Sequence, residues 1–299
     1  MANFEEQITQ TGYVQAVPRP TRKELQEFYR DKYFQDPSGS YQIEYSIEEL
    51  EYFKISAELA NFCITDIFQT PVKTLLDLGC GEGFFASHMS RLGWQVSCFD
   101  YSDAGISRFN SHLLPNFTAG SIEDALSELN SGENRDFAVI NLANVLEHVI
   151  EPEDVLEQIR RKLAQQTFGL VRIVVPNDYS AFQNLLLELG IARKTWFCPP
   201  EHLNYFNHTT LTALLESVGF EVVQTLADFP IEWFIANSNS NYHLNPEKGK
   251  GAHQARVLIT RFLASQGMPK FAEFCRATAS LDIGRDLITY AMPRGFNSR

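Results

Sequence analysis

Three glycines at alternating positions follow an apolar strand that ends in an acidic residue, and together they form a candidate ligand-binding site. Residues 75–83 read LLDLGCGEG, in which Asp77 is the acidic residue. Glycines at a strand-to-helix turn let a ligand lie directly against the main chain, because no Cβ holds the ligand off. The next apolar strand, residues 96–99, runs into Asp100, where a carboxylate can accept hydrogen bonds from both hydroxyls of a ribose. The two strand ends predict a nucleoside-binding α/β domain.

Two classes of cofactor fit a glycine turn that is followed by a ribose-binding carboxylate. A dinucleotide enzyme has the spacing G-x-G-x-x-G, whereas this turn has G-x-G-x-G and places Phe84 where the third glycine would stand. A diphosphate also favours a helix N-terminus without negative charge, yet Glu82 lies inside the turn. S-adenosylmethionine carries no phosphate, and its cationic groups are compatible with Asp77. The turn therefore favours S-adenosylmethionine, and a pyridine dinucleotide is the competing interpretation.

Length and charge restrict the partners of this chain. It has 299 residues, a hydrophobic fraction of 44%, a net charge of −12 and a pI near 5.1. These values fit one large domain with insertions, or two small domains. The acidic balance argues against a nucleic-acid partner, because no excess of Lys and Arg is available to displace counterions from a phosphate backbone. We expect the substrate to be a small molecule.

Cysteine usage and the N-terminus bear on the cellular compartment. The five cysteines are scattered and form no C-x-x-C pair, so neither a disulfide framework nor a zinc cluster is indicated. Residues 1–6 lack the basic and apolar regions of a signal peptide, and no stretch approaches the ~18 to 20 apolar residues that span a bilayer. We therefore expect a cytoplasmic protein without membrane association.

Apolar strand-like segments alternate with helical segments from about residue 50 to residue 225, which is typical of a parallel sheet covered by helices on both faces. The pattern predicts an α/β fold with a doubly wound, seven-stranded Rossmann-like sheet. The expected strands lie near 73–78, 95–99, 116–118, 136–142, 169–175, 220–225 and 286–291. The expected helices lie near 84–92, 103–112, 121–129, 152–164 and 209–218.

Three segments fall outside this alternation. Residues 1–72 form a helix-prone leader that is rich in tyrosine, with Tyr29, Tyr33, Tyr41, Tyr45 and Tyr52. Residues 177–208 and 227–284 interrupt the core, which is expected to span 73–292 and to leave 293–299 as a tail. Ligands bind outside the carboxyl ends of the strands in a doubly wound sheet, so we expect the leader and both insertions to act as lids.

A second motif begins in the fourth expected strand. Residues 136–149 read DFAVINLANVLEHV and contain the adjacent pair Glu147 and His148. Residues 201–206 read EHLNYF and lead into a helical segment that ends at Gly219. With the glycine turn, these motifs make the chain resemble the class I S-adenosylmethionine-dependent methyltransferases, in particular the subgroup that includes ubiquinone-pathway O-methyltransferases and sugar or natural-product methyltransferases. The resemblance covers roughly residues 70 to 225.

The resemblance implies a set of cofactor-binding residues. Asp77 and the glycines would bracket the methionine part and the ribose, Asp100 would bind the ribose hydroxyls, and Tyr101 would pack on the adenine. The segment 121–123 would reach the adenine ring, and Leu142 and Asn144 would line the wall near the sulfonium. Leu142 is also compatible with plain core packing, and Glu123 with a favourable charge at a helix start. The complete set is Asp77, Gly79, Cys80, Gly81, Gly83, Asp100, Tyr101, Ser121, Ile122, Glu123, Leu142 and Asn144.

Methyl transfer from a sulfonium mainly needs alignment of the acceptor, and a hydroxyl acceptor also benefits from a base that removes its proton. The resemblance puts His148 and His202 near the reactive end of the cofactor, with Tyr205 as a third candidate. Each histidine has an alternative role as an anchor for its loop. Some ubiquinone-pathway relatives bind magnesium with a carboxylate three residues before a Glu-His pair, but this chain has Asn144 there, so we expect no metal.

The insertions carry aromatic and Asn-rich segments, such as residues 229–234 and 237–245. Aromatic faces with polar rims suit a sugar, although these aromatics are equally compatible with the core of a lid. The resemblance implies a nucleotide sugar or a natural product as further possible acceptors. We therefore predict an enzyme that methylates an oxygen, or else a nitrogen, of a small polar acceptor, with a homodimer as one possible assembly. The alternative is a regulatory or scaffold subunit that binds the cofactor without turnover.

Overall fold

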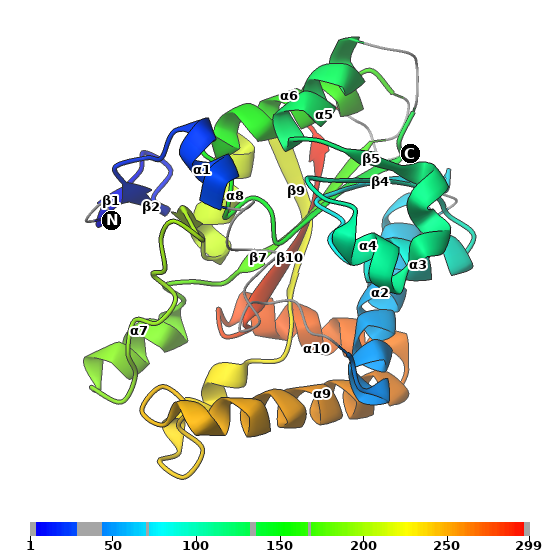
Figure 1. Ribbon diagram of the computed structural model, residues 1–299. Coiled ribbons are helices and arrows are strands. Elements are labelled where there is room, and N and C mark those ends of the chain that lie inside the picture. Colours follow the sequence, from blue (N-terminus) through cyan, green and yellow to red (C-terminus); the bar gives the residue numbers. More distant parts are fainter. Residues whose placement is uncertain (1–3, 29–43, 70–71, 132–135, 167–168, 296–299) are drawn as a thin grey trace.

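The structure is a computed structural model that describes residues 4–28, 44–69, 72–131, 136–166 and 169–295 (Figure 1). Tyr29, Tyr33 and Tyr41 of the predicted leader lie outside the described residues.

A seven-stranded sheet forms the centre of the molecule, in the order β5-β4-β3-β6-β7-β10-β9. The strands from β5 to β7 run parallel, and β10 is antiparallel to both β7 and β9. The predicted doubly wound α/β sheet is thus confirmed. The strands are β3 (Thr74–Leu78), β4 (Gln95–Asp100), β5 (Phe117–Ala119), β6 (Val139–Ala143), β7 (Leu170–Pro176), β9 (Phe220–Ala227) and β10 (Asp286–Pro293).

Helices cover both faces of this sheet and bury its apolar side chains. One face packs against α5 (Ile122–Ser131), α6 (Pro152–Ala164) and α8 (His208–Ser217). The other packs against α2 (Ile47–Phe68), α3 (Phe84–Arg91) and α10 (Met268–Ser280), and α9 (Gly249–Ser265) contacts α2 and α10. Figure 1 shows α5 and α6 on one side of the sheet and α2 and α10 on the other. Side chains of alternate strand residues therefore enter two separate cores.

The N-terminal region differs from the helical prediction. Residues 5–17 form a hairpin of β1 (Glu5–Ile8) and β2 (Val14–Val17), which pairs with β8 (Asn204–Tyr205) in a second sheet. Gly12 turns the hairpin with a φ of 89°, and the prolines after β2 disfavour a helix there. The helical prediction is wrong for this stretch. Within the described part of the leader, helix forms in α1 (Arg22–Phe28) and in α2, which begins with a capping box between Ser46 and Glu49.

Two further elements start or end differently from the prediction. The helix expected over 103–112 stops early as α4 (Ala104–Phe109) and continues as the 3-10 helix η2 (Ser111–Asn116), which contains Pro115. The strand expected from 136 begins three residues later, at Val139. The insertions contain α7 (Ala181–Glu188), η3 (Ile231–Ala236) and η4 (Pro246–Lys248) besides α9 and α10. Within the part of the chain that the structure describes, no helix has both the length and the hydrophobicity needed to cross a membrane.

Candidate functional site

The glycine turn between β3 and α3 can be built only from glycine at its tightest point. Gly79 has a φ of 77°, and a Cβ there would come within 2.4 Å of the Val145 Cγ2 atom. The amides of Gly79 and Cys80 donate to the Phe99 carbonyl at 2.7 and 3.1 Å, so the turn is fastened to the end of β4. A side chain at residue 79 would therefore break both the backbone conformation and the packing.

Asp100 lies at the end of β4, directly beside this turn. The Gly81 amide donates to the Asp100 Oδ2 atom at 2.8 Å. Burial raises the pKa of Asp100, and hydrogen bonds from the amides of Gly81, Ser102 and Tyr101 oppose that increase. The main chain thus orients the carboxylate, and Asp100 is bonded to the glycine turn. Its predicted contact with a ribose stays a prediction.

Asp77 points from β3 into the same region and is only 2% exposed. Its Oδ1 atom accepts a hydrogen bond of 2.6 Å from the Asn141 side-chain amide. Its Oδ2 atom is buried and has no hydrogen-bond partner among the described residues. Burial raises the pKa of Asp77 to about 6, while the Asn141 hydrogen bond and the charge of Arg172 lower it. A buried carboxylate oxygen without a donor is costly, so this atom fits a donor from a ligand.

The residues predicted to contact adenine lie around the start of α5. Tyr101 is 41% exposed, and burial together with the charge of Glu123 raises its pKa to about 12. The Ser121 hydroxyl accepts from the Asp124 amide at 3.0 Å, so it caps the start of α5. Glu123 lies in the first turn of that helix, and Ile122 packs against the adjacent core. Glu123 therefore has the helix-start position that we considered as its alternative role.

The other three predicted cofactor residues differ in exposure. Leu142 is fully buried in the core that α5, α6 and α8 cover, so its side chain packs against protein. Asn144 is exposed just after β6, has a φ of 56° and donates its amide to the Val174 carbonyl at 2.9 Å. Cys80 is half-buried next to Cys98 of β4. Of these three side chains, Asn144 is therefore the most open to a ligand.

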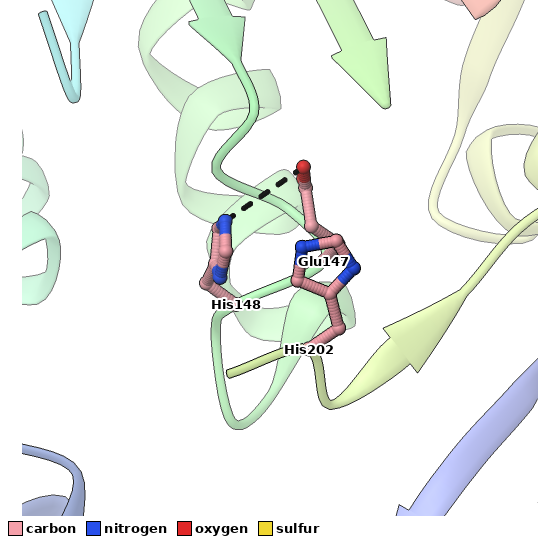
Figure 2. A group of neighbouring side chains, drawn as sticks. All are labelled: Glu147, His148 and His202. Atoms are coloured by element: carbon pink, nitrogen blue, oxygen red, sulfur yellow. Dashed lines mark ion pairs between the residues drawn. The ribbon is translucent and has the colours of Figure 1, made fainter. Parts of the chain in front are cut away.

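Glu147, His148 and His202 converge at the end of β6, and Figure 2 shows the three side chains together. The His148 Nε2 atom lies 3.8 Å from Glu147 Oε1, and the His148 Nδ1 atom lies 2.6 Å from the Glu201 carbonyl. The rings of His148 and His202 meet edge to face, with their centroids 4.8 Å apart. Glu147 Oε2 and His202 Nδ1 are both buried without a hydrogen-bond partner among the described residues. Two polar atoms of the cluster are therefore available for hydrogen bonds within the described part of the chain.

Burial sets the protonation of this cluster. It lowers the pKa of His148 to about 4 and that of His202 to about 3, and the charge of His148 adds to the effect on His202. Burial also raises the pKa of Glu147 well above its ordinary value. Both imidazoles are therefore neutral near pH 7 and carry a lone pair. Such nitrogens can accept a proton or bind a metal ion.

The same three side chains could hold a divalent ion, because their ligand atoms all lie within 4.8 Å of one another. Two imidazoles and a single carboxylate suit zinc-like ions better than magnesium, which prefers oxygen ligands. Asn144, three residues before Glu147, is neutral and supplies no second carboxylate. The donor set therefore fits magnesium poorly.

Tyr205, the third catalytic candidate, already uses its hydroxyl within the protein. The hydroxyl donates to the His202 carbonyl at 2.7 Å and accepts from the Cys198 amide at 3.2 Å. The residue is 1% exposed, and burial raises its pKa. These contacts make Tyr205 an anchor for the segment that carries His202.

Sequence reasoning missed the residues that hold the loops carrying His148 and His202. The Arg19 guanidinium donates to the Leu203 carbonyl at 2.8 Å, to the carbonyls of Val149 and Ile150, and to Asn204. The Asn204 amide in turn donates to the Val149 carbonyl at 2.8 Å. An isolated arginine between two prolines carries no pattern that would mark this role.

The leader also reaches the glycine turn. The Tyr45 hydroxyl donates to Glu82 Oε2 at 2.7 Å, and its ring packs against Phe53, Phe84 and Phe109. Glu82 and Phe84, which distinguish this turn from a dinucleotide-binding turn, are therefore both in contact with the leader.

Comparison with known proteins agrees with this arrangement. A family described as methyltransferase domain matches residues 47–225, so the chain belongs to the methyltransferase-domain family. This confirms the predicted resemblance to class I methyltransferases, whose cofactor is S-adenosylmethionine.

Two relatives are ubiquinone biosynthesis O-methyltransferases. That of Paraburkholderia xenovorans is 32% identical over 89 residues, which cover 29% of this chain and 38% of the relative. That of Caulobacter sp. strain K31 is 32% identical over 127 residues, which cover 42% and 49%. The chain thus spans less than half the length of each of these two relatives.

A solved structure supports the fold alone. The plantazolicin methyltransferase BamL, in complex with a triazolic desmethylPZN analog and SAH, has a TM-score of 0.51 and 14% identity. The similarity covers 90% of this chain and 94% of BamL.

Proposed function

We propose that this protein transfers a methyl group from S-adenosylmethionine to an oxygen of a small polar acceptor, such as a sugar, a nucleotide sugar or a natural product. The observation that carries this proposal is the cluster of Glu147, His148 and His202, which lies just after β6, the strand next to Asp77 in the sheet. The O-methyltransferase relatives support oxygen as the methylated atom. Transfer to nitrogen is the second possibility.

The residues around the glycine turn fit the cofactor. Gly79 and Gly81 both have a positive φ, Asp100 is oriented by the Gly81 amide, and Asp77 has a buried oxygen without a donor among the described residues. When bound, S-adenosylmethionine supplies an activated methyl group on a cationic sulfur. We infer that Asp77 receives its ammonium group and that Asp100 receives the ribose hydroxyls.

His148 is our first choice for the base. Its Nδ1 atom faces the Glu201 carbonyl, so Nδ1 carries the hydrogen and the lone pair lies on Nε2. That lone pair can accept the hydroxyl proton of the acceptor, and the carboxyl group of Glu147 lies 3.8 Å from the Nε2 atom. His202 packs edge to face on this ring and is the second candidate. Tyr205 positions His202.

The insertions at 177–208 and 227–284 are proposed as the lids that select the acceptor. Their ends are joined by buried charges, since Arg285 bonds Asp178 at 3.0 Å and lies 3.6 Å from Glu232. Aromatic pairs such as Tyr179 with Trp196 and Phe229 with Trp233 supply rigid surface. A cytoplasmic location and a possible homodimer stay predictions.

The direct test is to incubate the protein with S-adenosylmethionine and a library of hydroxyl and amine acceptors. Release of S-adenosylhomocysteine that depends on an acceptor, with a product heavier by one methyl group in mass spectrometry, is the expected result. Cofactor binding is measured in parallel by calorimetry, with NAD as a competitor that should have no effect. Binding without turnover across the library would favour the regulatory or scaffold alternative, and displacement by NAD would favour a dehydrogenase.

A further inference from the structure

A row of buried polar side chains crosses the sheet inside the core that α2, α3 and α10 cover. Asp77 of β3 is in register with Asn141 of β6, Asn141 with Arg172 of β7, and Arg172 with Tyr290 of β10. Each of these four residues is at most 2% exposed. Their neighbours along each strand on this face are apolar. A polar row in such a place has to be explained.

Hydrogen bonds connect the two charged members through the amide between them. The Asn141 Nδ2 atom donates to Asp77 Oδ1 at 2.6 Å, and Arg172 Nη1 donates to Asn141 Oδ1 at 2.6 Å. The Arg172 guanidinium carbon also lies 4.7 Å from the centroid of the Phe85 ring on α3. Asn141 therefore has a fixed amide orientation and links the guanidinium of Arg172 to the carboxylate of Asp77 through two hydrogen bonds.

This row is a poor device for stability. The desolvation free energy of a buried carboxylate and guanidinium usually exceeds their mutual attraction. Apolar residues at the same positions are often as stabilising or more so. The bonds also remain incomplete, because Asp77 Oδ2 and Arg172 Nε are buried without partners among the described residues. The open oxygen lies on β3, the strand that leads into the glycine turn.

We propose that Arg172 is a positioning residue for the cofactor: acting through Asn141, it keeps Asp77 ionised and turned so that Oδ2 receives the ammonium group of S-adenosylmethionine. This inference rests on the proposed function. It adds two residues, Arg172 and Asn141, that touch neither the cofactor nor the reacting atoms. The inference also predicts that loss of Arg172 or Asn141 weakens the binding of the amino-acid part of the cofactor and leaves the binding of its adenosine part unchanged.

The test of this inference has to account for the other charged and titratable groups that face Asp77. They are Arg172, Asp100 on β4, and the thiols of Cys80 and Cys98. Asp100 is itself predicted to bind the ribose, so its protonation would also weaken a nucleoside ligand. A pair of ligands that share the ribose and differ only in the amino-acid part separates the two carboxylates.

The experiment measures dissociation constants of S-adenosylhomocysteine and 5′-methylthioadenosine by calorimetry between pH 5 and pH 8. Both ligands carry adenosine and a thioether, but only the first has the amino-acid part. In the wild-type protein, the preference for S-adenosylhomocysteine should fall as the pH drops through about 6, because Asp77 becomes protonated and loses its attraction for the ammonium group.

Replacing Arg172→Met should raise the dissociation constant of S-adenosylhomocysteine about tenfold at pH 7. It should change the dissociation constant of 5′-methylthioadenosine less than about twofold. The pH at which the preference is lost should move upward, because the cation that favours the ionised carboxylate is gone. Asn141→Leu should give the same pattern, and Arg172→Lys should restore part of the preference. Thr289→Val is the matched control, since Thr289 is equally buried on β10 but packs on the opposite face.

Each outcome decides the inference. Equal weakening of both ligands, or an unchanged ratio in Arg172→Met and Asn141→Leu, would assign the row a purely structural role. If neither variant folds, Arg172→Lys decides, because a ratio equal to that of the wild-type protein at every pH would assign the row a purely structural role, and a ratio that falls at a higher pH would support the inference. If the wild-type protein binds neither ligand, the proposed function itself fails.

Discussion

The two halves of the candidate site are held in different ways. On the cofactor side, Asp77 and Asp100 lie at the ends of adjacent strands and are oriented by bonds from Asn141 and from the Gly81 amide. On the acceptor side, His148 and His202 lie in loops after β6 and β7. Contacts from distant segments hold these loops, such as Arg19 of the leader and the Tyr205 hydroxyl.

This difference has consequences for function. Because Asp77 and Asp100 lie on strands of the sheet, we expect the cofactor side to bind its ligand without large movement. The residues of this side also follow a local sequence pattern. The loops of the acceptor side depend on long-range packing and can change with the substrate. Substitutions on the cofactor side should therefore affect binding, and substitutions on the acceptor side should affect turnover or stability.

The largest effect is expected from His148→Ala. Turnover should fall about 100- to 10,000-fold, the usual contribution of a general base, while binding of S-adenosylhomocysteine changes little. His202→Ala should shift the same two quantities in the same direction. Steady-state kinetics and calorimetry measure them.

The matched control is His88→Ala, because His88 lies on α3 and its imidazole bonds Arg91 of the same helix. It should leave turnover unchanged. A loss of unfolding free energy in His148→Ala that accounts for the lost activity would make His148 an anchor of the loop and break the contrast between the two halves.

Asp100→Ala tests the cofactor side. It should weaken binding by about 1.5 to 3 kcal/mol, the range for hydrogen bonds to a charged group, since both the ribose bonds and the orientation of the turn are lost. Asp103→Ala is the control, because Asp103 is exposed and makes no capping bond at the start of α4. Unchanged affinity in calorimetry would remove Asp100 from the site.

The same contrast explains what the sequence could predict. The seven strands and the glycine turn follow from alternating apolar segments and from glycine spacing, which are local signals. Asn141 and Arg172 were missed, although a polar residue inside each of two apolar strands was a usable signal. The hairpin at 5–17 was missed because it depends on pairing with β8, far along the chain. Arg19 had no local signal at all.

Tyr205→Phe should have a smaller effect. Removing the hydroxyl takes one hydrogen bond from the His202 carbonyl and one from the Cys198 amide. The free energy of unfolding, measured by urea titration, should fall by about 1 to 2 kcal/mol. Turnover should fall less than about tenfold. A collapse of turnover at full stability would instead make Tyr205 the base, and the acceptor side would then have a different catalytic residue.

The smallest effect is expected from removing divalent ions. Treatment with EDTA should leave turnover unchanged, and added magnesium should not raise it, because the cluster offers one carboxylate and two neutral imidazoles, with Asn144 in place of a second acid. Added zinc should inhibit, since it would occupy the His148 lone pair that accepts the proton. Loss of turnover in EDTA, with recovery on adding a divalent ion, would show that the three side chains bind a metal. His148 would then orient the acceptor as a metal ligand, and the acceptor side would be held as rigidly as the cofactor side.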